Sequence, residues 1–81
     1  MAREPEFLAP VVRIRRTGRH VFLIAWERDK NGRWRGRVAW LARENVAWRG
    51  VDVWMPADDL EQVAGEDHRR VLRYIAHDSA F

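Results

Sequence analysis

The chain has 81 residues, enough for one small domain, because chains divide into separate cores only well above this length. It contains no cysteine, which excludes a disulfide framework and a thiolate metal site. With 47% hydrophobic and 33% charged residues it is too apolar to be disordered throughout, and its longest apolar run, residues 21–26, is too short to span a membrane. We therefore expect a single folded domain in the cytoplasm.

The net charge of +3 hides an asymmetry along the chain. Residues 1–49 carry twelve Arg or Lys against five Asp or Glu, a net charge of +7, while residues 50–81 carry three against seven, a net charge of −4. Nearly all the basic residues are arginine, which binds phosphate through two nitrogens and stacks on bases. Nucleic-acid chemistry explains this excess, and so does a GC-rich coding sequence. The positions of the arginines in the fold decide between the two explanations.

The first half of the chain predicts strands joined by tight turns. Residues 1–10 hold two prolines and no periodicity, which is typical of a flexible arm. Alternation over residues 11–16 and a β-rich run over residues 20–26 predict two strands joined by a turn at residues 17–18. Residues 28–32, Arg-Asp-Lys-Asn-Gly, predict a hairpin turn because Asp, Asn and Gly tolerate left-handed backbone conformations.

Residues 33–41 show the clearest alternation in the chain. Apolar residues or glycine occupy the even positions, and Arg33, Arg35 and Arg37 occupy odd positions. Since successive side chains of a strand point to opposite faces, this pattern predicts a strand with one core face and one basic face.

The following segments are less regular. Residues 42–47 predict a loop, and residues 48–55 contain a further strand with a bulge or a turn at Gly50. Pro56 ends that strand, and the acidic residues that follow predict a helical turn at residues 58–60.

Residues 65–81 predict a C-terminal helix and tail. Val71, Leu72 and Ile75 have helical spacing behind an acidic start and beside a basic stretch. A last strand at residues 71–75 is the competing interpretation.

The order of these elements resembles the small five-stranded antiparallel β-barrels of the Src homology 3 (SH3) type. Residues 34–37 (WRGR) are similar to the Trp, small residue and basic residue that open the third strand in that superfamily. Gly50, residues 54–60 (WMPADDL) and Val63 are similar to its later loop, the apolar pair before a proline, and the closing strand. The resemblance covers residues 11–64 and implies a mainly β, SH3-like barrel with a helical turn after the proline.

Two departures from that pattern concern function. Peptide-binding members have a long acidic loop between the first two strands, where this chain has only residues 17–19. They also carry a groove aromatic at the position of Asp59. The resemblance therefore points to the wider set of SH3-like barrels, whose ligands include DNA, RNA and proteins.

Side chains suited to catalysis or metal binding are scarce. Ser79 lies near the C-terminus and Thr17 lies in a turn, so no nucleophilic triad is indicated. The three histidines, His20, His68 and His77, lack the short spacing that pairs metal ligands on a helix. We expect no enzymatic activity, no bound metal and no cofactor.

The basic strand face is the strongest functional signal. Arg33, Arg35 and Arg37 repeat about every 7 Å along a strand, close to the spacing of phosphates along a nucleic-acid strand. Arg13 and Arg15 extend the row if the first strand lies alongside. The predicted contacts to DNA or RNA are Arg13, Arg15, Lys30, Arg33, Arg35 and Arg37, with Trp34 and Trp48 as stacking platforms. The alternative is that the arginines form the solvated or self-paired face of an antiparallel sheet.

The five tryptophans fit both core and surface roles. Trp26, Trp34, Trp40 and Trp54 fall at strand positions where one face is apolar, so we expect two or three of them in the core. Trp48 lies in a connecting region and is expected at the surface, and Trp34 joins it if the barrel resemblance extends to an exposed groove aromatic. A second functional hypothesis follows, a protein-interaction or homo-oligomeric module with surface tryptophans as its contact patch. No membrane or small-molecule substrate is inferred.

Overall fold

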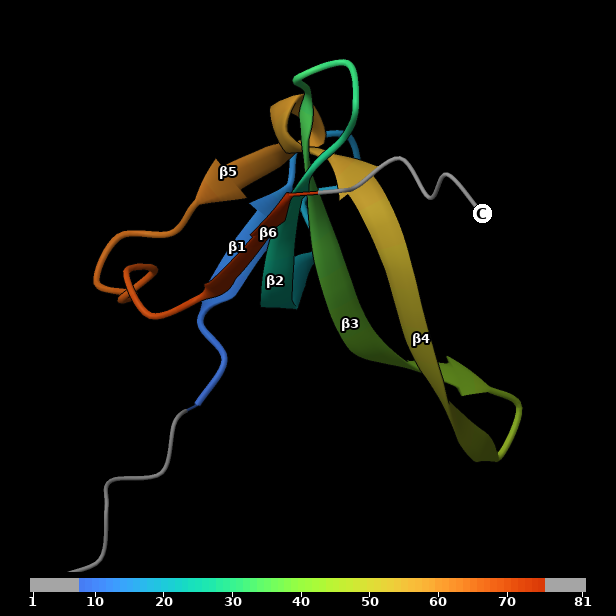
Figure 1. The fold of residues 1–81 in the computed structure, drawn as a ribbon. Helices are drawn as coiled ribbons and strands as arrows, with labels where there is room; N and C mark the ends of the chain where they lie inside the picture. The colour runs from blue at the N-terminus through green and yellow to red at the C-terminus, as the bar shows by residue number, and fades with distance from the viewer. Residues whose placement is uncertain (1–7, 76–81) are drawn as a thin grey trace, which may run out of the picture.

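The computed structural model describes residues 8–75, which form one curved sheet (Figure 1). Its elements are β1 (Val11–Ile14), β2 (His20–Arg28), β3 (Trp34–Glu44), β4 (Ala47–Pro56), the 3-10 turn η1 (Ala57–Asp59), β5 (Leu60–Gln62) and β6 (Leu72–Ile75). The strands lie in the order β4-β3-β2-β1-β5 with antiparallel neighbours, and β6 pairs with β2 in parallel. The expectation of a mainly β domain is confirmed.

The turn between β2 and β3 is the hairpin predicted at residues 28–32. Oδ1 of Asp29 accepts hydrogen bonds from the backbone N–H groups of Asn31 and Arg33, both at 2.9 Å. Gly32 has φ +80°, a conformation that is strained for residues with a Cβ atom. The side chain of Asp29 and the backbone of Gly32 together explain why the chain reverses here.

The prediction of a loop at residues 42–47 is wrong. β3 continues to Glu44, β4 begins at Ala47, and only two residues connect them. Asn45, the first of the two, has φ +54°, which asparagine tolerates better than most residues. The polar composition of residues 42–47 suggests a loop, but this end of the β3–β4 hairpin projects away from the rest of the sheet (Figure 1). Neither of its faces therefore has to be apolar.

The β-bulge lies in β2 rather than at Gly50. The ladder of β3 and β4 runs through Gly50 without a shift, whereas the ladder of β2 and β3 shifts between Leu23 and Ala25. At that point β2 exchanges one neighbour for another, β1 before the bulge and β6 after it. The backbone N–H of Leu23 donates to the carbonyl of Pro10 at 2.8 Å, so Pro10 is fixed against the sheet. The rest of the predicted arm, residues 1–7, lies outside the described residues.

The C-terminal helix is not present in the described part of its range, and the competing prediction of a last strand is confirmed. Leu72 to Ile75 pair with Ala25 to Arg28, and Val71 is buried just before them. The physical reason is the bulge, because beyond it β2 has backbone groups without a partner in β1, and β6 supplies one. Residues 76–81 of the predicted helix and tail lie outside the described residues.

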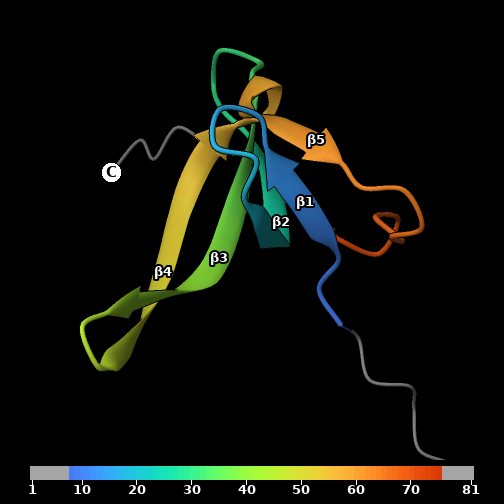
Figure 2. The same cartoon turned by 180° about the vertical axis from the view of Figure 1, so that it is seen from behind.

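The sheet is curved (Figure 2), and the core side chains gather on its inner face. It consists of Val12, Ile14, Val21, Leu23, Val38, Leu60 and Val71, with Trp26, Trp40, Val53 and Met55 packed against it. Of the four strand tryptophans, Trp26 and Trp40 pack against the core, whereas Trp54 pairs with Arg37 and therefore lies on the outer face. Hydrogen bonds do not close the sheet into a barrel, since the described strands form no ladder between β4 and β5.

In residues 8–75, no helix has the length and apolar character needed to cross a membrane.

Candidate nucleic-acid interface

Arg35 and Arg37 lie on the outer face of β3, and both are bound to carboxylates. Nε of Arg35 donates to Glu27 at 2.8 Å, and its guanidinium lies 5.0 Å from the centre of the Trp54 ring. Nε of Arg37 donates to Asp52 at 2.8 Å, and this hydrogen bonding lowers the pKa of Asp52. Phosphate would have to compete with a carboxylate for each of these guanidinium groups.

Arg13 and Arg15 share a single carboxylate, that of Glu61 on the neighbouring strand β5. Nε of Arg13 donates to Glu61 at 3.0 Å and a terminal nitrogen of Arg15 donates at 3.2 Å. The hydrogen bonding to Arg13 is the main cause of the lowered pKa of Glu61. Glu61 and Asp52, both from residues 50–81, thus neutralise arginines from residues 1–49 within one molecule.

Asp67 and Arg69 form a further ion pair in the loop before β6. Both the side chain and the backbone N–H of Arg69 donate to the carboxylate, at 3.0 Å for the backbone group. These hydrogen bonds lower the pKa of Asp67 to about 2.

Replacing Arg69 by Ala will raise the pKa of Asp67 towards its ordinary value. The folded-state pKa is depressed, so the ionised carboxylate stabilises the folded state above the ordinary value of 3.8, and this contribution is lost as the pH falls through about 2. NMR titration of the Asp67 carboxyl in the parent and in Arg69→Ala measures the change. The same titration curve in both proteins would show that Arg69 does not hold this carboxylate in solution.

Lys30 and Arg33 lie in the β2–β3 turn, and their environment differs from that of the strand arginines. No carboxylate of residues 8–75 pairs with either side chain, nor with that of Arg28 at the start of the turn. The one acidic residue of the turn, Asp29, uses a carboxylate oxygen to bind backbone N–H groups. The turn therefore presents three cationic side chains against one carboxylate.

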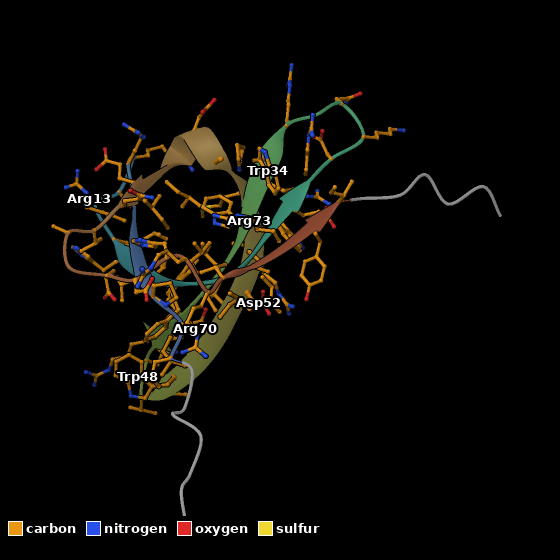
Figure 3. All side chains as sticks on the ribbon, turned by 60° about the vertical axis from the view of Figure 1, so that its left-hand side comes forward. Arg13, Trp34, Trp48, Asp52, Arg70 and Arg73 are labelled. Atoms are coloured by element: carbon orange, nitrogen blue, oxygen red, sulfur yellow. The ribbon has the colours of Figure 1, made fainter. Side chains whose placement is uncertain are left out.

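Beside this turn the inner face opens into a cavity of about 290 Å³. Its lining residues are Trp26, Trp34, Ala57, Gln62, His68 and Arg73. They come from β2, β3, η1, β5, the loop before β6, and β6 itself, so the curvature of the sheet assembles the cavity. Figure 3 shows Trp34 and Arg73 at the same end of the sheet. No carboxylate lines the cavity, and Arg73 has no ion pair within residues 8–75.

Trp48 does not join Trp34. It pairs with Arg43, nine residues along β3 from Trp34, a distance of about 30 Å at the rise of a strand. Trp48 is 66% exposed, as expected, and Trp34 is 39% exposed. The two tryptophans lie at opposite ends of the ribbon (Figure 3) and cannot contact the same base.

Several residues at this end of the sheet are not predicted from the sequence as site residues. Trp26 was expected in the core, and it does pack there, but it also forms a wall of the cavity. Arg73 was assigned to a helix, and its alternation within a short strand is the signal that would have placed it on the inner face. Gln62 and His68 gave no signal in the sequence, because only the curvature of the sheet brings β5 and the loop before β6 to the cavity.

The outer face carries a shallow apolar depression of about 430 Å³, lined by Phe22, Ala39, Trp40, Leu41, Gly50, Val51 and Asp52. Phe22 and Leu41 are exposed there. This surface lies on the opposite side of the sheet from the buried core.

Across residues 8–75, His, Asp and Glu side chains form no group of three that could hold a metal ion. Comparisons with protein-family models, curated proteins and solved structures gave no match to this chain.

Proposed function

We propose that this chain is a non-catalytic module that binds single-stranded nucleic acid at the end of the sheet formed by the β2–β3 turn and the adjoining cavity. In this proposal its fold is an open variant of the SH3-like barrel. One observation carries the proposal, namely a cavity walled by Trp26 and Trp34 that lies beside cationic side chains without carboxylate partners in the described chain. Cationic grooves with aromatic platforms are the common means of binding single strands.

Lys30, Arg33 and Trp34 form the centre of the proposed interface, and Arg28 and Arg73 extend it. The strand arginines Arg13, Arg15, Arg35 and Arg37 have a different role, because their carboxylate partners already satisfy them. Trp48 is too far away to act with Trp34. The interface therefore lies at the turn rather than along the basic strand face.

A single strand is favoured over a duplex because the indole faces can stack only on bases that are unpaired and accessible. Phosphates bound by the turn would hold such a strand across the mouth of the cavity.

The test is an anisotropy titration of a labelled single-stranded nonamer at about 50 and 200 mM salt. Three phosphate contacts, by Arg28, Lys30 and Arg33, give a slope of log K against log salt of about −2.1, so affinity will fall about 18-fold over this range. A duplex of the same length will bind more weakly. No binding of the single strand at low salt, or binding that salt does not weaken, would contradict the proposal.

Self-association is the second candidate function, and the apolar depression on the outer face favours it. Phe22 and Leu41 expose apolar surface there, and β4 is an edge strand within the described sheet. Sedimentation equilibrium tests this candidate. A concentration-dependent dimer that Leu41→Asp abolishes would support it, and a strict monomer at high micromolar concentration would remove it.

A further inference from the structure

We infer that the cavity beside Trp34 captures one unstacked base of the bound strand and prefers guanine. The inference rests on the proposed function and identifies the part of the nucleic acid that the aromatic cavity binds.

The size and walls of the cavity suit a base. Its volume of about 290 Å³ lies at the lower end of the range for small-molecule sites, which fits a ligand smaller than a drug. Trp26 packs against the core on one side, so its indole is held in place as a wall. Trp34 remains 39% exposed, so its ring is open to a ligand. Stacking on indole surfaces stabilises any base and explains capture, but not preference.

The preference for guanine comes from Arg73, the guanidinium group of the lining. The guanidinium of Arg73 only donates hydrogen bonds, and it presents two of them side by side. Guanine offers two adjacent acceptors, O6 and N7, which match this fork, whereas adenine replaces one acceptor with an amino donor. Nε2 of His68 donates to the carbonyl of Val11 at 3.1 Å, which holds the imidazole ring at the cavity wall.

The same lining argues against a cationic ligand. Aromatic cavities also bind quaternary ammonium groups through the faces of their rings. Here the charged group in the lining is Arg73, and no carboxylate accompanies it, so a cation would meet repulsion. A neutral aromatic ring with acceptor atoms fits this chemistry better.

The phosphates on either side of the captured base lie within reach of the turn. Arg28 is paired with Trp34 across the ladder, so these two side chains lie on the same face of the sheet, and Lys30 and Arg33 lie in the turn that joins their strands. One strand can therefore place a base against Trp34 while its phosphates contact Arg28, Lys30 and Arg33.

The experiment separates the base from the phosphates. Three nonamers of abasic sugar-phosphate units are titrated by anisotropy: one with no base, one with a single central guanine and one with a single central adenine. We expect guanine to increase affinity about tenfold over the base-free chain, with quenching of Trp fluorescence. Adenine should bind at least about fivefold more weakly than guanine.

Variants identify the groups responsible. Trp34→Ala should lower the affinity for the guanine nonamer to that for the base-free nonamer. Trp34→Phe should retain most of the affinity that guanine adds. Arg73→Lys keeps the charge but loses the fork, so it should abolish the difference between guanine and adenine. Trp48→Ala is the matched control, an exposed tryptophan on the neighbouring strand, and should change nothing.

The outcomes separate the two proposals. If all three nonamers bind equally, or if Trp34→Phe loses as much as Trp34→Ala, base capture by Trp34 is overturned while phosphate binding at the turn stands. If adenine binds as well as guanine, the preference assigned to Arg73 is overturned. If no nonamer binds at low salt, the proposed function fails and the base site fails with it.

Discussion

Replacing Lys30 and Arg33 together by alanine will weaken binding of a single-stranded nonamer about 25-fold at 100 mM salt. Each lost phosphate contact reduces the slope of log K against log salt by about 0.7, so two contacts reduce it by about 1.4. Over the tenfold range from 1 M to 0.1 M salt, this difference in slope amounts to a factor of about 25 in affinity. Both side chains are free of carboxylate partners in residues 8–75, so no internal ion pair has to break before they bind phosphate. Anisotropy titrations at several salt concentrations measure the affinity and the slope together.

The matched control removes two arginines from the outer strand face. Arg35→Ala with Arg37→Ala changes the net charge by the same amount, but these side chains are bound to Glu27 and Asp52. Its effect should stay within about threefold, since only the general attraction between the charged molecules changes. If the control loses as much affinity as the turn variant, the strand face is the interface and our assignment is wrong.

Replacing Gly36 by alanine will lower the free energy of unfolding by about 2 kcal/mol. A Cβ atom at this position would lie 2.8 Å from Cδ1 of Leu60, 3.0 Å from Cδ1 of Leu23 and 3.1 Å from Cζ3 of Trp26. Leu23 is 0% exposed and Leu60 is buried, so neither can swing into solvent to make room. Because Trp26 also forms a wall of the cavity, the displaced indole should weaken base capture as well.

Gly50→Ala is the control, because it makes the same substitution in the neighbouring strand. A Cβ atom there meets nothing within 4 Å. Alanine is favoured over glycine in a strand by about 0.5 to 1 kcal/mol, so this variant should be slightly more stable than the parent. Denaturant unfolding followed by Trp fluorescence compares the two. Equal effects of the two substitutions would show that close packing does not explain the glycine at position 36.

The charge asymmetry of the chain was visible in its sequence, but its meaning was not. The basic part by itself is compatible with a phosphate-binding surface and with a solvated or self-paired sheet face. In the fold, Asp52 and Glu61 reach back to arginines of the basic part. Much of the apparent row of free charge is therefore satisfied within the molecule, whereas Arg28, Lys30 and Arg33 at the β2–β3 turn have no carboxylate partner in residues 8–75.

Strands and turns with local signals follow from the amino-acid sequence alone. The hairpin at residues 28–32 follows from the side chain of Asp29 and the backbone of Gly32, and the alternation over residues 33–41 assigns the core face of β3. The conformation of residues 72–75 depends on tertiary contacts. Their spacing fits a helix or a strand, and the exposed edge of β2 beyond its bulge selects the strand. The site depends on tertiary structure as well. The register of the strands pairs arginines with carboxylates that are distant in sequence, and the curvature of the sheet brings Trp26, Trp34 and Arg73 together. Periodicity assigns a side chain to a face, but only the packed fold determines which neighbours it meets.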